Sequence, residues 1–405
     1  MNKVKTKLIT WGIIFAAAIL SPVVFPPTAV LADETGQAAA PGGEIGPGFA
    51  KPAEPAPAPP AVGPGVEPFL SEPASDPSEM IGDIRNLEPD SPIIPLMDKY
   101  SYEQMTHDIT NLSEVYGNLM SVNVIGQSLD NRDIYEVVIG NPDSDKHILI
   151  QAGIHAREQL PPLLVMKQLE LALYSCRRGS YNGRPVSELL NHAALHFIPM
   201  SNPDGIALSQ FGMSAIRSEE LRDNILHCYE NDLCMGRTSS GLEQYLIHWK
   251  ANARGVDLNN NFDAGWEQME QLEAPSYAGY KGTAPFTEPE TQALLNLVNQ
   301  REWAATVSYH AMGNLIYWDF PVNGQRDSSR HLGNLMAAAT GYRMSLSPDS
   351  YGGFKDWMQS SEHSAPSVTL EVGIGTCPLP ISDFLVIWSQ NKTVWAVALE
   401  FVLPQ

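Results

Sequence analysis

The sequence is poor in basic residues and in cysteine. Its 405 residues carry 25 Lys and Arg against 46 Asp and Glu, a formal net charge of -21. Binding phosphates requires clustered Lys and Arg, so this balance argues against nucleic acid as a partner and against electrostatic attachment to anionic membranes or wall polymers. The four cysteines include no Cys-x-x-Cys pair, so no thiolate zinc site is indicated. The four cysteines are Cys176, Cys228, Cys234 and Cys377. They could form two disulfides in three different pairings, or they could remain free thiols.

Two common catalytic motifs are also absent. There is no Gly-x-Ser-x-Gly elbow for a nucleophilic serine and no Gly-Lys-Ser/Thr loop for binding phosphates. We find no internal repeat and no recognisable wall-binding module. Nothing in the sequence therefore supports serine-hydrolase or nucleotide chemistry.

The N-terminus has the pattern of an export signal. Three lysines within the first seven residues precede an apolar run over 8–20, and residues 30–32 are suited to a cleavage site. We predict a signal peptide over residues 1–32, no stable membrane anchor after cleavage, and a secreted, cell-wall-associated bacterial protein. The alternative is an uncleaved anchor over 8–30, which three prolines disfavour. Lipid attachment is not indicated, because no cysteine follows the apolar run.

A Pro/Ala/Gly-rich segment follows. Residues 33–90 hold 12 prolines and show no apolar periodicity, a composition that cannot bury a core. We predict a disordered tether over residues 33–94 and a catalytic domain over residues 95–405. A mere spacer or a pro-segment is an equally good reading of the tether.

Strands alternate with helices in the remaining chain, which predicts an α/β layered domain. Strands are expected at 122–125, 134–139, 147–151, 194–199, 304–309 and 367–372. Helices are expected at 101–116, after Glu158, and at 288–299, 329–340 and 381–401.

Three potential metal ligands stand at or just after the ends of predicted strands. His155 and Glu158 are three residues apart, so one turn can direct an imidazole and a carboxylate to one point, and His310 closes another strand. Two histidines and one glutamate, with a fourth position left to water, form a catalytic zinc arrangement. Glu371 ends a third strand and is the natural candidate for the general base. This pattern predicts one Zn²⁺ per chain and a hydrolytic reaction.

A lone His-x-x-Glu is more often an ordinary side-chain pair, but here five motifs follow one another in a fixed order. They are His155-Ala-Arg-Glu158, Asn202-Pro-Asp-Gly205, Arg254-Gly-Val-Asp-Leu-Asn-Asn-Asn-Phe262, Ser308-Tyr-His310 and Leu370-Glu-Val-Gly373. From about residue 95 onward, the chain resembles the zinc metallocarboxypeptidase (funnelin) family. The resemblance implies a mixed twisted β-sheet with helices on both faces, zinc held by His155, Glu158 and His310, and Glu371 as the general base.

The resemblance also implies roles for two cations. Arg157 matches a substrate-contacting arginine within the family's zinc motif. The stretch Trp249-Lys-Ala-Asn252 resembles a family segment whose arginine polarises the scissile carbonyl, and Lys250 takes that place. Lysine keeps the charge but loses the planar fork. A solvated surface lysine is the alternative for Lys250.

Two departures from the family pattern concern the substrate. Family carboxypeptidases read Asn-Arg where this chain has Asn259-Asn260, and that arginine grips the substrate's terminal carboxylate. Asn260 cannot form a charge-assisted bidentate clamp, unless another basic residue compensates. Lys355 stands at the floor of the pocket for the residue after the cut bond and predicts selection of a carboxylate. The alternative is an internal salt bridge. Tyr351 adjoins the double glycine, whereas the family's mobile tyrosine precedes it by four positions.

These features resemble the bacterial γ-D-glutamyl-(L)-meso-diaminopimelate endopeptidase branch of the family. We predict a secreted zinc metallopeptidase that cuts peptidoglycan stem peptides at the γ-D-glutamyl–diaminopimelate amide. Arg157 and Lys250 would stabilise the oxyanion, Asn259 would orient the substrate, and Lys355 would pair with the side-chain carboxylate of diaminopimelate. One alternative is a secreted carboxypeptidase that removes acidic C-terminal residues. Another is a non-catalytic wall-peptide binding protein.

The segment from Phe211 to Trp249 is long and directly precedes Lys250. It could line or cover the cleft, and a plain surface excursion is an equally good interpretation.

Overall fold

The computed structural model describes residues 82–270, 272–320, 326–347, 351–360 and 363–404. The predicted signal peptide and residues 33–81 of the predicted tether lie outside the described residues. Within the described ranges, no helix combines the length and the apolar character needed to span a membrane.

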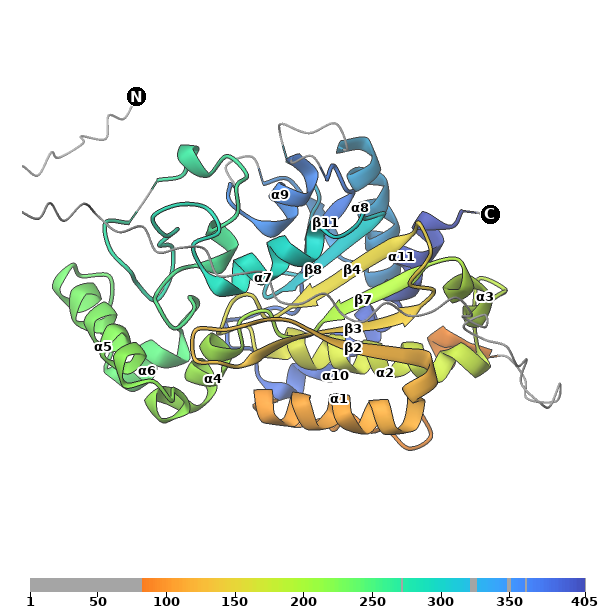
Figure 1. The fold of residues 1–405 in the computed structure, drawn as a ribbon, viewed down its shortest axis with the longest axis horizontal. Coiled ribbons are helices and arrows are strands. Elements are labelled where there is room, and N and C mark those ends of the chain that lie inside the picture. The colour runs from red at the N-terminus through yellow and green to blue at the C-terminus, as the bar shows by residue number, and fades with distance from the viewer. Residues whose placement is uncertain (1–81, 271, 321–325, 348–350, 361–362, 405) are drawn as a thin grey trace, which may run out of the picture. The chain divides into compact units, whose positions relative to one another are not determined.

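An eight-stranded mixed sheet forms the middle of the fold (Figure 1). Its strand order is β10-β9-β11-β8-β4-β7-β3-β2. The four central strands β11, β8, β4 and β7 run parallel, whereas β3, β2 and β9 pair antiparallel with their neighbours. The strands are β2 (Met120–Gln127), β3 (Asp133–Gly140), β4 (His147–Ala152), β7 (Ala194–Ile198), β8 (Ala305–His310), β9 (Leu315–Tyr317), β10 (Arg343–Ser345) and β11 (Ser367–Glu371). A small second sheet joins β1 (Gly82–Asp83), β5 (Gly179–Tyr181) and β6 (Arg184–Pro185).

Helices cover both faces of the large sheet. The helices are α1 (Tyr102–Tyr116), α2 (Leu160–Arg178), α3 (Val186–Asn191), α4 (Pro203–Phe211), α5 (Glu219–Cys234), α6 (Leu242–Ile247), α7 (Pro289–Val298), α8 (Arg326–Thr340), α9 (Phe354–Ser360), α10 (Phe384–Asn391) and α11 (Val394–Val402). Buried residues of α1, α2, α8, α10 and α11 share one core with the sheet, and those of α7 and α9 share the other. The predicted three-layer α/β/α fold is therefore confirmed.

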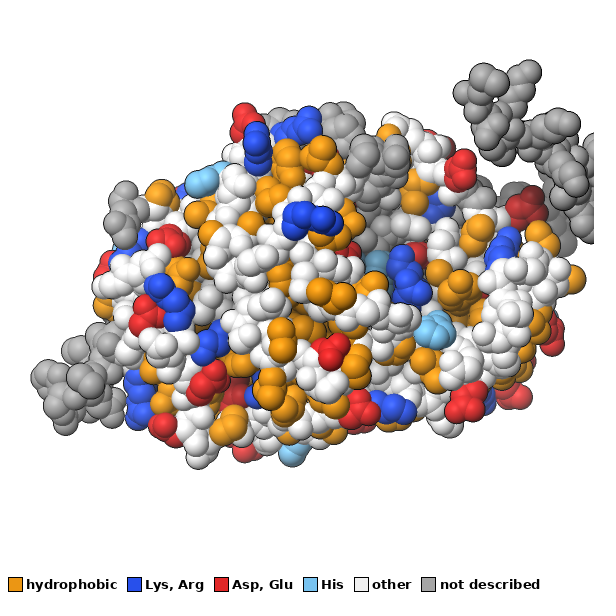
Figure 2. All heavy atoms as spheres, turned by 180° about the vertical axis from the view of Figure 1, so that it is seen from behind, with side chains coloured by type: hydrophobic (Ala, Val, Ile, Leu, Met, Phe, Trp, Pro, Cys, Tyr) orange, Lys and Arg blue, Asp and Glu red, His pale blue; other side chains and the backbone are white. Residues whose placement is uncertain are grey.

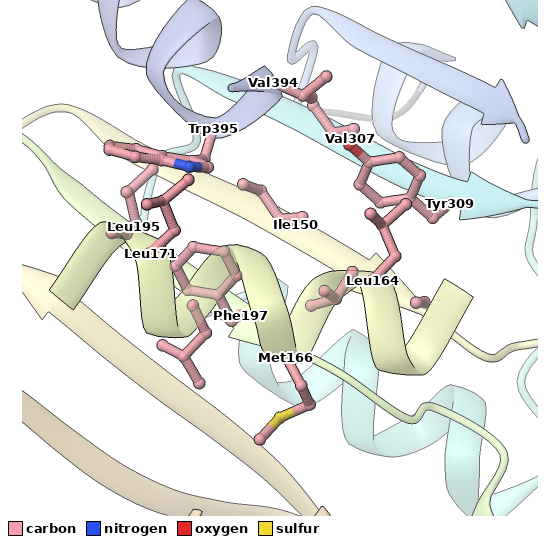
Figure 3. Close-up of a cluster of buried hydrophobic side chains, with 14 of the residues drawn as sticks. Ile150, Leu164, Met166, Leu171, Leu195, Phe197, Val307, Tyr309, Val394 and Trp395 are labelled. Carbon is pink, nitrogen blue, oxygen red and sulfur yellow. The ribbon is translucent and has the colours of Figure 1, made fainter. Parts of the chain in front are cut away.

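The alternation of side chains along the strands produces these two cores. Ile148 and Ile150 of β4 join the first core, while Leu149 between them joins the second. Figure 3 shows the first core, where strand side chains such as Ile150 and Phe197 meet Leu164 of α2 and Trp395 of α11. Because both faces of the central strands are covered, β4, β7 and β8 read as nearly continuous buried runs.

Most predicted elements are present, and one is broken. The helix expected over 381–401 is interrupted between α10 and α11. The interruption follows Asn391, whose carbonyl accepts a hydrogen bond from Gln168 Nε2 at 2.5 Å and whose Nδ2 donates to Tyr342 Oη at 2.7 Å. Buried hydrogen bonds of Asn391 with Gln168 and Tyr342 therefore lie where the helix was expected to continue. The elements that were not predicted are β1, β5, β6, β9, β10, α3, α4, α5, α6 and α9.

Residues 82–94 differ from the prediction, because they pack on the catalytic domain instead of continuing the tether. Strand β1 pairs in parallel with β5, and the side chains of Ile84 and Ile94 are almost completely buried. The backbone N–H of Ile94 donates to Glu170 Oε2 at 3.2 Å. The many prolines of this segment led to the prediction of a tether, whereas the burial of Ile84 and Ile94 attaches the segment to the domain.

Surface charges of both signs are mixed, and the cysteines are unpaired. On the face in Figure 2, acidic and basic side chains are interspersed, and neither kind gathers into a broad patch among the described residues. All four cysteines are free thiols.

We expect Ile84→Ala to lower the free energy of unfolding by about 2–4 kcal/mol, because it removes a fully buried side chain and leaves a cavity. Urea unfolding of the purified protein measures this change. Leu96→Ala, at a residue that is 48% exposed, is the control and should change stability by less than about 0.5 kcal/mol. Equal effects of the two substitutions would show that residues 82–94 do not stabilise the domain.

Candidate active site

Three buried side chains converge at the C-terminal edge of the parallel strands. His155 follows β4, His310 ends β8, and Glu158 lies in the turn before α2. The Nδ1 atom of His155 is 2.8 Å from Glu158 Oε1, and that of His310 is 3.2 Å from Glu158 Oε2. The potential ligand atoms of all three residues lie within 4.8 Å of one another. Two imidazoles and a carboxylate in this arrangement fit a zinc ion.

Local backbone geometry places this group. Gly153 has a φ of 69°, and a Cβ added there would lie 2.8 Å from Ile206 Cδ1. Glycine therefore permits the tight turn that carries the chain from β4 to His155. The backbone N–H of Ala311, just after β8, donates to Glu158 Oε2 at 3.1 Å and holds the carboxylate toward His310.

Asp257 is a fully buried carboxylate that connects the ligand group to the next loop. Its Oδ1 lies 3.3 Å from His155 Nε2, and its Oδ2 lies 3.0 Å from Lys250 Nζ. Burial alone would raise the pKa of Asp257, but Lys250 and then His155 hold that pKa below its usual range. A carboxylate beyond a ligating histidine fixes the ring orientation and its tautomer.

The loop that carries Lys250 is held from both sides. Trp249 is fully buried, and its Nε1 donates to the carbonyl of Asn252 at 3.1 Å. The backbone carbonyl of Lys250 accepts a hydrogen bond from Ala156 at 3.1 Å, one residue after His155. Lys250 is therefore a positioned cation beside the ligands and not a solvated surface lysine.

Glu371 ends β11 and stands in parallel register with His310 of β8. Burial raises the pKa of Glu371 to about 7, although the neighbouring His310 lowers it. A carboxylate with a pKa near neutrality, beside a metal-ligand group, is suited to take up and release a proton.

His155, Glu158, Lys250 and Glu371 line one cleft with a volume of about 410 Å³. Arg157 extends along it, and neither a hydrogen bond nor an ion pair engages its guanidinium within the described part of the chain. His248, Tyr317 and the segment 375–377 complete the walls. The structure thus brings together six of the predicted site residues: His155, Arg157, Glu158, Lys250, His310 and Glu371.

The four predicted substrate-binding residues are not among the described residues that line this cleft. Asn259 Oδ1 accepts the backbone N–H of Phe354 at 3.0 Å and so anchors the start of α9. The ring of Tyr351 packs edge-on against Phe320, with 6.2 Å between the ring centroids. Asn260 is half-buried next to Gly352.

Lys355 is engaged inside the protein. It is buried, and its Nζ donates to the Asp356 carboxylate and to the carbonyl of Asp319. The acidic partner that a buried lysine requires is therefore Asp356. This geometry supports the internal salt bridge and not the predicted pairing of Lys355 with a substrate carboxylate.

Residues 105–394 match the sequence profile of the family described as zinc carboxypeptidase. This chain belongs to the zinc carboxypeptidase family. It is 33% identical over 304 residues to gamma-D-glutamyl-L-diamino acid endopeptidase 1 of Lysinibacillus sphaericus, covering 74% of this chain and 72% of that one. It is 24% identical over 206 residues to mast cell carboxypeptidase A of Mus musculus, covering 50% and 42%. The predicted family and the resemblance to the endopeptidase branch are confirmed, and the chain is a metallopeptidase.

Solved structures agree with the fold. The crystal structure of thrombin activatable fibrinolysis inhibitor superposes with a TM-score of 0.59 at 18% identity, covering 80% of each chain. Carboxypeptidase A from Helicoverpa armigera gives a TM-score of 0.54 at 18% identity, covering 77% of each chain.

Sequence reasoning did not assign a role to Asp257 or His248. Asp257 lies within the quoted Arg254–Phe262 motif, two residues before Asn259, so its position was a usable signal. His248 had no such signal, because only the packing of α6 brings it to the cleft.

We expect the purified protein to bind one zinc ion per chain and His310→Ala to lose it. Asp257→Asn should weaken zinc binding by roughly 10- to 100-fold, because it removes the carboxylate that orients His155. Competition with a chromogenic chelator measures both effects, and His331→Asn, at an exposed residue of α8, is the control. Wild-type affinity in His310→Ala would contradict the assignment of the ligands.

Proposed function

We propose that this protein is an exported zinc peptidase that hydrolyses the γ-D-glutamyl–diaminopimelate amide of peptidoglycan stem peptides. The observation that carries the proposal is a complete peptidase site combined with Asn260 at the position of the carboxylate-gripping arginine. The relative from Lysinibacillus sphaericus, which bears the name of a gamma-D-glutamyl-L-diamino acid endopeptidase, supports the same bond.

The surroundings of Asn260 support a substrate that continues beyond the cut residue. The nearby loop carries Lys281, but this lysine is buried, and its Nζ donates to the carbonyls of Trp266 and Met269 at 2.9 Å each. The ammonium group of Lys281 is thus bound by backbone carbonyls of the protein, so Lys281 does not replace the missing arginine. Asn260 and Lys281 therefore give no reason to expect that the substrate must have a free terminal carboxylate directly beside the cut bond.

The chemistry then divides among the residues of the cleft. A zinc ion held by His155, Glu158 and His310 would polarise the scissile carbonyl and lower the pKa of water to near 7. Glu371 takes the proton from the attacking water and delivers it to the departing amine of diaminopimelate. Lys250, fixed by Asp257, and Arg157 stabilise the charge that develops on the carbonyl oxygen.

The N-terminal pattern supports action outside the cytoplasm. Residues 1–32 are proposed to direct export, and the proline-rich residues that follow are proposed to give the peptidase reach within a cell wall.

A carboxypeptidase that removes acidic C-terminal residues is the second candidate. The similarity to mast cell carboxypeptidase A supports its reaction type but not its acidic preference. The two candidates differ in their products. The endopeptidase releases L-Ala-γ-D-Glu from L-Ala-γ-D-Glu-diaminopimelate-D-Ala, whereas the carboxypeptidase trims C-terminal residues and stops when the C-terminus is amidated.

We expect mass spectrometry to detect L-Ala-γ-D-Glu from this tetrapeptide with the zinc-loaded protein, whether or not its C-terminus is amidated. Glu371→Gln should lower kcat by roughly 10²- to 10⁴-fold, the usual contribution of a positioned general base, while zinc content stays at one per chain. An intact tetrapeptide, together with trimming of acidic C-terminal residues from ordinary peptides, would replace the endopeptidase proposal with the carboxypeptidase.

A further inference from the structure

We propose that His248 is a specificity-determining residue that binds the α-carboxylate of the γ-linked D-glutamate. This inference rests on the proposed function and deepens it, because it names the feature of the acyl residue that the cleft recognises. His248 directly follows α6 and lies two residues before Lys250 on the same loop.

A hydrogen bond holds the imidazole of His248 in one orientation. Its Nδ1 lies 3.0 Å from the backbone carbonyl of Cys377, and a carbonyl can only accept, so Nδ1 carries the proton. Within the described part of the chain, Nε2 has no hydrogen-bond partner, and the half-buried ring lines the cleft. The residue therefore presents a fixed and unused nitrogen to the substrate.

The position of His248 assigns it to the acyl side of the cut bond. The residue after the cut is expected on the side of Asn260, which does not line the wall that carries His248. That wall is formed by the loop around His248 and by Gly375, Thr376 and Cys377, which follow the base Glu371. A γ-linked D-glutamate on this side places its α-carboxylate four bonds from the scissile carbonyl carbon and its acylated nitrogen on the carbon next to that carboxylate. In an α-linked glutamate the acylated nitrogen lies instead on the carbon next to the scissile carbonyl.

The charges of the cleft favour an anion at this place. Arg157 and Lys250 line the same cleft as cations, although Lys250 is paired with Asp257. The other titratable groups in the lining are His155, Glu158, Tyr317, Glu371 and Cys377. When the imidazole is protonated, both nitrogens donate, so Nε2 can hold a carboxylate while Nδ1 keeps its bond to Cys377.

The test compares two peptides that differ only at the proposed contact. One is L-Ala-γ-D-Glu-diaminopimelate, and the other carries a carboxamide in place of the α-carboxylate. His248→Asn keeps an N–H donor near the Cys377 carbonyl and removes Nε2, whereas His248→Ala removes both. His227→Asn, at an exposed histidine of α5, is the matched control.

We expect the wild-type protein to prefer the carboxylate peptide in kcat/KM by roughly 10- to 100-fold, the range of a hydrogen bond to a charged group. His248→Asn should reduce this preference to within about threefold by lowering kcat/KM for the carboxylate peptide more than for the carboxamide peptide, and His227→Asn should retain the preference.

Two results would overturn the role of His248 and leave the proposed function intact. The first is equal kcat/KM of the wild-type protein for the two peptides. The second is an equal loss of kcat/KM on both peptides in His248→Asn, which would indicate that His248 only makes a structural contact with Cys377. Cleavage of neither peptide by the wild-type protein would overturn the proposed function and this inference together.

Discussion

The site depends on one buried carboxylate, Asp257, which has to be neutralised where it lies. An isolated carboxylate in the protein interior is costly, and Asp257 is stable because His155 and Lys250 approach its two oxygens at 3.3 and 3.0 Å. That requirement joins the turn after β4, which carries the metal-ligand group, to the loop after α6, which carries the cation for the scissile carbonyl. A ligand and an electrostatic residue far apart in sequence thus become one rigid unit.

The sheet supplies the other half of the geometry. Because β4, β8 and β11 are parallel neighbours, their C-terminal ends meet at one edge, and His155, His310 and Glu371 meet there with them. Side chains at strand ends are held by the packed layers beneath, so substrate preference can change in the surrounding loops without disturbing the ligands. Asn260 and Lys355 are departures of this kind from the family pattern, and His248 lies on one of these loops, directly after α6.

The fold and the meeting of His155, His310 and Glu371 at one edge of the sheet could be predicted from the sequence, because each rests on a local rule. Buried parallel strands read as short apolar runs, and the motifs that end them place His155, His310 and Glu371 at one edge. Contacts between distant segments could not be predicted in the same way. Lys355 and Asp356 are adjacent in sequence, but only the folded α9 closes their salt bridge and brings the Asp319 carbonyl to it. The contact of His248 with Cys377 spans 129 residues, and the carbonyl of Asn391 bonds to the distant Gln168 where the helix is interrupted. No local sequence pattern predicts contacts of this kind.

The central claim is that this cleft selects a γ-linked acyl residue. The most direct measurement compares kcat/KM for L-Ala-γ-D-Glu-diaminopimelate with that for its isomer in which diaminopimelate is joined through the α-carboxyl group. The two peptides have the same composition and the same charge, so only the linkage differs. We predict that the γ-linked isomer is cleaved at least about tenfold faster, because moving the acylated nitrogen to the carbon beside the scissile carbonyl displaces the carboxylate from its charge-assisted contact. Equal rates, or faster cleavage of the α-linked isomer, would contradict the account.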